Sequence, residues 1–160
     1  MSIHVRLAQS ADLAVLADLF NQYRQFYEQA DDLAAAYTFL QQRFEQQQST
    51  VLLAMDDTPA DGAQVVGFCQ LYPSFCSVEL INIEVLYDLF VLPATRGQGV
   101  GRALLLAAEN RAAQQGIGRL DLTTAHTNLT AQALYESLGW VQDLTFRTYT
   151  RHIVSAAKND

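Results

Sequence analysis

The fold is decided by the stretch Leu89-Phe90-Val91-Leu92-Pro93-Ala94-Thr95-Arg96-Gly97-Gln98-Gly99-Val100-Gly101-Arg102-Ala103-Leu104-Leu105. It begins as an apolar strand, passes through a glycine-rich turn and continues as a helix that runs to about Gln115. Glycines permit positive φ angles and let a ligand approach the main chain closely. The first turn of a helix carries N–H groups without intrahelical partners and the positive end of the helix dipole. This order of elements therefore predicts a site for a phosphate or pyrophosphate group.

Two well-known phosphate motifs do not match this turn. A Walker A loop ends in Gly-Lys followed by Ser or Thr, but Gly101 is followed by Arg102. The dinucleotide pattern G-x-G-x-x-G requires a further glycine where the chain has Arg102 or Leu104. A turn whose glycines only shape the start of a helix remains the alternative. Three glycines at alternate positions beside Arg96 favour anion binding.

The rest of the chain predicts an α/β (α+β) fold built on one mixed sheet. The apolar patterns predict helices over 13–20, 31–44 and 128–138, and strands over 3–7, 51–55, 64–72, 77–91, 120–124 and 140–150. The stretch 77–91 exceeds the usual strand length of about 3–10 residues, so we expect a bend, bulge or break within it. This order of elements predicts helices on both faces of the sheet. We expect residues 1–160 to form a single domain.

Composition excludes several classes of protein. The chain has 160 residues, of which 50% are hydrophobic, and a net charge of −7 from 10 basic and 17 acidic residues. This composition is too apolar for a disordered chain and too acidic for a nucleic-acid binder. Two cysteines are too few for a disulfide scaffold. Without a signal-like N-terminus or an apolar run of about 20 residues, we expect a cytoplasmic protein that does not enter a membrane.

Two segments resemble the GNAT N-acetyltransferase superfamily. Arg96-Gly97-Gln98-Gly99-Val100-Gly101 matches the signature R/Q-x-x-G-x-G/A. The segment from Asn128 to Trp140 is similar to the family's second cofactor segment, N-x-x-A-x-x-L-Y-x-x-x-G-F/W. The opening strand is similar to the family's first strand, so the resemblance covers essentially the whole chain.

The resemblance implies acetyl-coenzyme A (acetyl-CoA) as the acetyl donor, with no metal. It implies that the main chain of Leu89, Phe90 and Val91 pairs with the pantetheine arm. The pyrophosphate would lie at the turn, on Arg96, Gly97, Gln98, Gly99, Val100, Gly101 and Arg102. Asn128 and Tyr135 would also contact the cofactor, and Tyr135 would give a proton to the departing thiolate. The alternative is that Tyr135 belongs to an apolar helix face with Ala131, Leu134 and Leu138.

Glu84 and Asp88 are the candidates for the general base. On an unbroken strand both side chains share one face, where a carboxylate can take a proton from the acceptor amine directly or through water. A bulge would change this arrangement. The segment 87–91 resembles the segment of polyamine acetyltransferases in which two adjacent acids meet the substrate. Asp88 matches the second acid and Tyr87 replaces the first, so the resemblance implies a cationic amine without implying a polyamine.

Aromatic and acidic residues gather where the family covers the acceptor. Tyr27 is the predicted substrate contact, together with its neighbours Tyr23, Phe26, Glu28, Asp31 and Asp32. A cation can be held by such rings and carboxylates. Core aromatics followed by acids at a helix start are the alternative.

The sequence therefore predicts an acetyl-CoA-dependent N-acetyltransferase acting on a primary amine of a small molecule or peptide. Direct transfer in a ternary complex is favoured, because no histidine pattern accompanies Cys69 or Cys76 to support an acetyl-cysteine intermediate. His126 is either a proton relay or a structural residue. The resemblance also makes a homodimer possible. The alternative function is a non-catalytic acyl-CoA sensor or accessory module.

Overall fold

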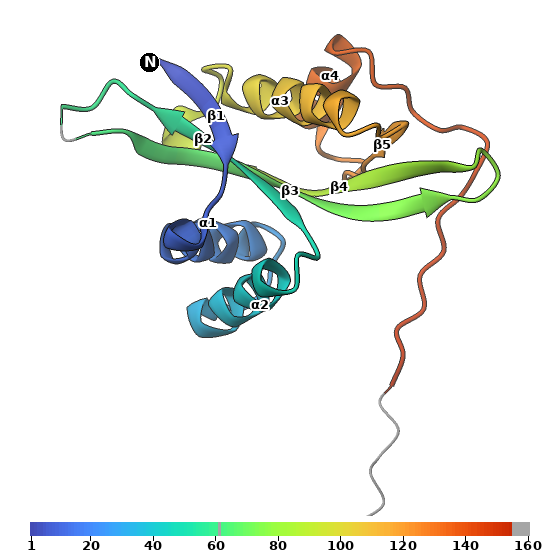
Figure 1. The fold of residues 1–160 in the computed structure, drawn as a ribbon, viewed down its shortest axis with the longest axis horizontal. Coiled ribbons are helices and arrows are strands. Elements are labelled where there is room, and N and C mark those ends of the chain that lie inside the picture. Colours follow the sequence, from blue (N-terminus) through green and yellow to red (C-terminus); the bar gives the residue numbers. More distant parts are fainter. Residues whose placement is uncertain (61, 155–160) are drawn as a thin grey trace, which may run out of the picture. The chain divides into compact units, whose positions relative to one another are not determined.

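A five-stranded mixed sheet forms the centre of the computed structural model, which describes residues 1–60 and 62–154 (Figure 1). The strands are β1 (Ile3–Leu7), β2 (Thr50–Asp56), β3 (Gln64–Cys76), β4 (Ile81–Val91) and β5 (Arg119–Asp121), and they lie in that order. The pairs β1–β2, β2–β3 and β3–β4 are antiparallel, and β5 pairs with β4 in parallel. The predicted α/β class and mixed sheet are confirmed.

Helices cover both faces of this sheet, as predicted. Figure 1 shows α1 (Leu13–Phe26) and α2 (Leu33–Glu45) on one face and α3 (Val100–Gln114) on the other. The acidic start expected for the second helix is present, since the Asp32 carboxylate accepts a hydrogen bond from the Ala35 N–H at 3.0 Å. The two faces are referred to below as the α1/α2 face and the α3 face.

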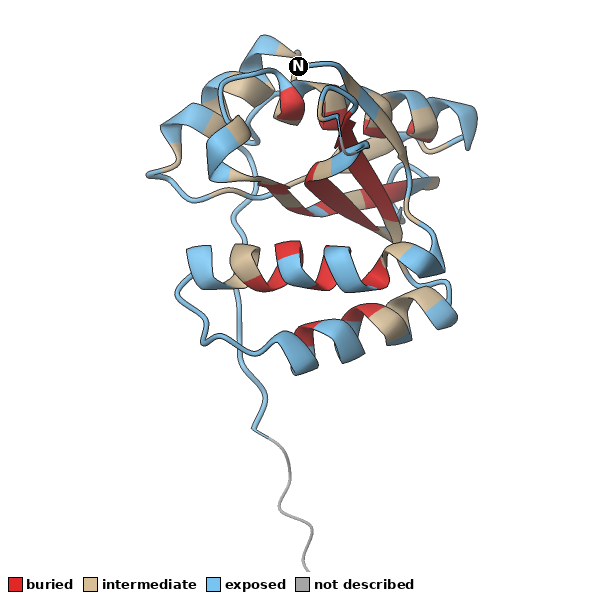
Figure 2. Cartoon of the chain, turned by 90° about the vertical axis from the view of Figure 1, so that its left-hand side faces the viewer, coloured by how far each residue is buried: buried red, intermediate tan, exposed pale blue. Residues whose placement is uncertain are grey.

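Each face has its own buried core. On the α1/α2 face, residues such as Leu16, Phe20 and Leu40 pack against Phe68 and Phe90 of the sheet. On α3, the buried side chains include Val100, Leu104, Leu105 and Ala108, which are at most 1% exposed. Figure 2 shows the buried residues concentrated on the strands and on parts of α1 and α2.

The start of α3 lies very close to the sheet. A Cβ placed on Gly67 of β3 would lie 2.8 Å from the Phe90 carbonyl oxygen and 3.2 Å from the Val100 side chain. Real side chains do not make such short contacts with a backbone oxygen. Glycine at position 67 therefore lets the start of α3 and the Phe90 carbonyl of β4 lie close against β3.

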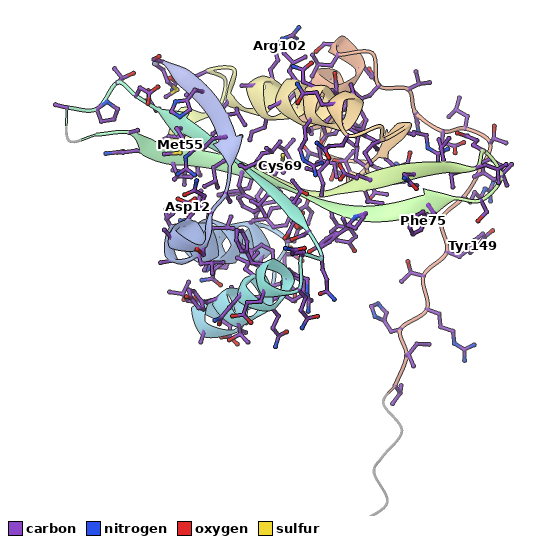
Figure 3. All side chains as sticks on the ribbon, viewed as in Figure 1. Asp12, Met55, Cys69, Phe75, Arg102 and Tyr149 are labelled. Carbon is purple, nitrogen blue, oxygen red and sulfur yellow. The ribbon has the colours of Figure 1, made fainter. Side chains whose placement is uncertain are left out.

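Strands β3 and β4 form a long hairpin, and their bounds differ from the predicted ones. β3 continues to Cys76 rather than ending at Tyr72, and β4 begins at Ile81 rather than at Ser77. Residues 77–80 form the turn between them, with Leu80 at a φ of 56°. Figure 3 shows Phe75 near this end of the hairpin, where its side chain is exposed.

The chain divides into two compact units, Met1–Thr123 with the sheet and a second unit from Thr124 with α4 (Leu129–Ser137). The strand predicted over 140–150 is wrong, because residues 140–154 form no strand. The Asp143 carboxylate accepts hydrogen bonds from the backbone N–H groups of Thr145 and Phe146. This local turn uses N–H groups that a strand would give to a neighbouring strand, so the apolar pattern alone was not enough to predict a strand.

No helix within the described residues has the length and apolarity needed to cross a membrane.

Candidate active site

Strand β4 has an open edge over its second half. It pairs with β3 from Ile81 to Val91, but its pairing with β5 covers only Ile83 to Val85. From Leu86 onward, within the described residues, no strand pairs with the other side of β4. The segment 89–91, predicted to contact the pantetheine arm, lies on this open edge. Its main chain can therefore pair with an extended ligand as a further strand would.

The turn after β4 has the geometry expected of an anion site. A short 3₁₀ helix, η2 (Pro93–Thr95), is followed by Gly97 and Gly99 with φ angles of 75° and 86°. Gly99 is the N-cap of α3, and no side chain caps this helix. The amides of Val100, Gly101 and Arg102 thus keep N–H groups that the helix itself cannot satisfy. A Cβ on Gly97 or Gly99 would meet nothing within 4 Å, so the space beside both glycines is open.

Two polar side chains of the turn brace the main chain. The Arg96 Nε donates to the Val91 carbonyl oxygen at 3.1 Å, and the Gln98 Nε2 donates to the Ala94 carbonyl oxygen at 3.2 Å. The Arg96 guanidinium also lies over the rings of Phe26 and Phe90, 5.6 and 5.8 Å from their centroids. Arg96 therefore joins the turn to the end of α1. Arg102, by contrast, is exposed on α3 (Figure 3).

The bulge expected within the long strand is present at Tyr87. Gln70 pairs with Asp88, whereas its neighbour Leu71 pairs with Leu86, so Tyr87 is an extra residue on β4. An extra residue reverses the face on which the following side chains lie. Glu84 therefore lies on the α3 face, and Asp88 lies with Phe90 on the α1/α2 face. The structure does not bring the two candidate bases together.

Glu84 is engaged in an ion pair beneath α3. Both of its carboxylate oxygens accept from Nη1 of Arg111 at 2.9 Å. Arg111 also donates from Nη2 to the Thr50 hydroxyl at 2.9 Å. Because Glu84 is only 5% exposed, this pair ties α3 to two strands of the sheet. Glu84 therefore helps to hold the fold together.

Asp88 is buried beside other polar groups on the α1/α2 face. It is 4% exposed, and Oδ2 accepts a hydrogen bond from Gln70 Nε2 at 2.7 Å. Burial raises the pKa of the Asp88 carboxyl, while hydrogen bonds from Gln70 and Tyr23 act in the opposite direction. The Tyr23 hydroxyl also lies 3.3 Å from the Tyr87 carbonyl oxygen. A carboxyl with a raised pKa is better suited to accept a proton near neutral pH than an ordinary one.

The aromatic segment at the end of α1 has two different parts. Tyr23 packs edge-on against Phe68 and Phe90 and is part of the apolar layer. Tyr27 is 43% exposed and packs edge-on against Tyr23 and Phe26. Tyr27 is therefore free to contact a ligand with part of its ring.

The acidic residues after this segment hold the connection between α1 and α2. Asp31 accepts from the Asn21 side-chain amide at 2.7 Å, and Asp32 caps α2. Glu28 adopts a left-handed backbone conformation with a φ of 61°. Asp32 is therefore a helix-start acid, whereas the Asp31 carboxylate links the connection back to α1.

The second unit holds the other two predicted cofactor residues. Asn128 is the N-cap of α4, and its side chain accepts from the Ala131 N–H at 3.4 Å. The Tyr135 ring lies 6.1 Å from the Trp140 ring, and the Trp140 N–H donates to the Tyr135 carbonyl oxygen. Tyr135 is partly buried. The helix predicted over 128–138 is therefore present as α4, and the roles predicted for Asn128 and Tyr135 stay predictions.

Cys69 is not placed as a nucleophile is. Cys69 lies in the middle of the sheet (Figure 3) and is fully buried, and burial raises the pKa of its thiol to about 12. Cys76 is partly buried, with its sulfur 3.7 Å from Nη1 of Arg119. A thiol that stays protonated cannot attack a thioester efficiently. Among the described residues, no cluster of His, Cys, Asp or Glu could hold a metal ion.

Comparison with known proteins identifies the family. The model of the acetyltransferase (GNAT) family matches residues 15–140. The chain belongs to the GNAT family. It is 42% identical over 151 residues to the uncharacterized N-acetyltransferase YhfO of Bacillus subtilis (strain 168), covering 94% of this chain and 98% of the relative. These findings support an acyltransferase.

Two further GNAT-related proteins support the assignment. The crystal structure of a probable acetyltransferase has a TM-score of 0.85 at 35% identity, covering 98% of this chain and 100% of the other. A thialysine N-epsilon-acetyltransferase of Bos taurus is 37% identical over 84 residues, covering 52% of this chain and 48% of the relative. Acetyl transfer in general is therefore the activity class of this GNAT protein.

Gln70 and Arg111 were not predicted from the sequence as part of the site. Gln70 lies on the strand paired with β4, and Arg111 lies 27 residues after Glu84 on a different element. Only the register between β3 and β4 reveals the first pair. The contact between Glu84 and Arg111 cannot be read from the sequence, because the two residues lie on different elements whose packing the sequence pattern does not show.

Proposed function

We propose that this GNAT protein transfers the acetyl group of acetyl-CoA to a primary amine of a small molecule or peptide, directly and without an acetyl-enzyme. The single observation that carries the proposal is the open edge of β4 leading into the uncapped start of α3. This edge offers main-chain groups for the pantetheine arm, and the turn offers amides for the pyrophosphate.

The acceptor amine must lose a proton before it can attack, because a free alkylamine has a pKa of about 10. We assign this task to Asp88 rather than to Glu84. Asp88 is buried on the α1/α2 face with a raised pKa, near the aromatic segment that contains Tyr27. Glu84 already accepts two hydrogen bonds from Arg111. Tyr27 offers an exposed ring face to a cationic substrate.

The departing thiolate needs a proton donor, and we assign this role to Tyr135. A phenol with an ordinary pKa of about 10 stays protonated at neutral pH and can donate. Asn128, at the start of the same helix, is proposed to contact the cofactor. The main-chain N–H near Phe90 or Val91 is proposed to donate to the thioester carbonyl as charge develops there.

The test is a thiol-release assay with acetyl-CoA and a panel of amines. The panel contains thialysine, lysine, spermidine, an aminoglycoside and a peptide with a free N-terminal alanine, each beside its N-acetylated form as a matched control. The proposal expects free coenzyme A to appear with at least one amine and with none of the acetylated controls. Tight coenzyme A binding without thiol release across the panel would instead support a non-catalytic sensor.

A further inference from the structure

Gln70 and Asp88 form a buried polar pair that the acetyl-transfer scheme does not yet explain. Gln70 is 0% exposed and Asp88 4%, and they face each other across β3 and β4 at the bulge. The pair is joined by one hydrogen bond of 2.7 Å from Gln70 Nε2. The other end of the amide, Oε1, is buried and has no hydrogen-bond partner among the described residues. A buried acceptor without a partner lowers stability, so its presence calls for an explanation.

The two protonation states of a carboxyl make opposite demands on a neighbour. A carboxylate can only accept hydrogen bonds, whereas a carboxylic acid also has an O–H to donate. A glutamine amide offers a donor at one end and an acceptor at the other. Turning the amide by half a rotation exchanges the two ends. Gln70 is therefore suited to both states of Asp88.

We propose that Gln70 is a positioning residue that holds Asp88 in both of its protonation states. In the ionised state, Gln70 Nε2 donates to the carboxylate, as the structure has it. When the acceptor ammonium gives its proton to Asp88, the amine becomes neutral and the carboxylate becomes a carboxylic acid. The Gln70 amide then turns, and Oε1 accepts from the new O–H. This inference rests on the proposed role of Asp88 as the base.

Several titratable groups from α1, β3 and β4 surround Asp88. Tyr23 from α1, Cys69 and Tyr72 from β3, and Tyr87 from β4 are its titratable neighbours, and Arg43 from α2 acts on Tyr72. Burial raises the pKa of Cys69 to about 12 and moves the pKa of Tyr72 above its ordinary value. Both therefore stay neutral at neutral pH. The Glu84–Arg111 pair acts on Cys69 from the α3 face.

The test follows the titration of Asp88 itself. Protein labelled with ¹³C at the aspartate carboxyls is titrated by NMR, and the Asp88 signal is assigned by its absence from Asp88→Asn. Gln70→Met keeps a side chain of similar length but removes both ends of the amide. We expect the pKa of Asp88 to rise by about one unit or more, because a hydrogen bond to the charged form is stronger than one to the neutral form.

In the pH profile of kcat/KM, the apparent pKa of the acid limb should rise by the same amount. This profile is measured with the amine of the panel that gives the highest rate. Gln22→Met is the matched control. It removes another glutamine-to-aspartate hydrogen bond, from Gln22 Nε2 to Asp18 at 2.9 Å, on the exposed side of α1. This control should leave both the Asp88 signal and the pH profile unchanged.

A second variant keeps the test decisive if Gln70→Met does not fold. Gln70→Asn retains the amide but draws it back from Asp88, so the titration should move in the same direction. If the folded variants titrate Asp88 within about 0.3 unit of the wild type, the inference is overturned. If the Asp88 signal moves but the rate profile does not follow, Gln70 still holds Asp88, and the role of Asp88 as the base is what fails.

Discussion

Glu84 and Asp88 lie four residues apart on β4, yet their side chains lie on opposite faces of the sheet. The extra residue Tyr87 lies between them and reverses the alternation. One carboxylate is held by Arg111 beneath α3, and the other is held by Gln70 on the α1/α2 face. The two acids therefore have different environments, and different effects are expected when each is replaced.

Asp88→Asn should remove most of the turnover. General-base catalysis contributes about 10²–10⁴-fold, so a loss of at least about 100-fold in kcat/KM is expected. Coenzyme A affinity, measured by calorimetry, should change little. Glu84→Gln is the matched control, and its folded fraction should keep its turnover. A large loss in folded Glu84→Gln together with an active Asp88→Asn would reverse the assignment.

Glu84→Gln should instead weaken the fold. Removing one partner of a buried ion pair leaves the other partner uncompensated, at a cost of about 3–5 kcal/mol. Arg111 keeps 24% of its side chain exposed, so we expect a loss near the lower end, about 3 kcal/mol, in urea unfolding. The double variant Glu84→Met with Arg111→Met should recover much of this loss. A single variant as stable as the wild type would contradict the pair's structural role.

The stability of Asp88→Asn should depend on pH. Because the folded protein raises the pKa of Asp88, the folded state binds this proton more tightly than the unfolded state does. The favourable contribution of protonated Asp88 is complete below about pH 4 and is lost as the pH rises through the folded pKa. The variant should therefore gain little at pH 4 and a few degrees of Tm at pH 8, by scanning fluorimetry. An equal shift at both pH values would contradict this direction.

Gly99→Ala should reduce coenzyme A affinity. At a φ of 86° an alanine strains the N-cap of α3 and shifts its free amides. Loss of one hydrogen bond to a charged group, about 1.5 kcal/mol, corresponds to roughly tenfold in Kd by calorimetry. Gly62→Ala is the control, since Gly62 has a φ of 107° and open space around it but lies between β2 and β3. Equal affinity losses in both variants would argue against the turn as the anion site.

Tyr135→Phe should slow the reaction by roughly 100-fold while coenzyme A affinity stays within about twofold. The phenylalanine keeps the ring beside Trp140 and removes only the hydroxyl that is proposed to donate a proton. Tyr149→Phe serves as the control, because Tyr149 belongs to the same unit and is 87% exposed. An unchanged rate in Tyr135→Phe would refute the donor role.

Local features of the site were predictable because they depend on a few neighbouring residues. The glycine turn, the start of a helix near residue 128 and the acidic start of α2 all follow from the conformational needs of short segments. The bulge in β4 was expected from strand length alone. The homodimer, the cytoplasmic location and the extent of the single domain remain predictions.

Contacts between distant segments could not be predicted in the same way. That Gln70 faces Asp88 depends on the register of a long hairpin, which one extra residue at position 87 changes. That Glu84 meets Arg111 depends on how α3 lies on the sheet. The strand predicted over 140–150 failed for a related reason, since a strand needs a neighbouring strand and the apolar pattern does not supply one.

The bulge at Tyr87 also affects how the protein can change over evolutionary time. Exposed residues of the α1/α2 face, such as Tyr27, can vary without disturbing the ion pair that anchors α3. Substitutions at such separated positions are expected to change the free energy of unfolding nearly additively. A new acceptor specificity could therefore arise on one side of the sheet while the donor side keeps its architecture.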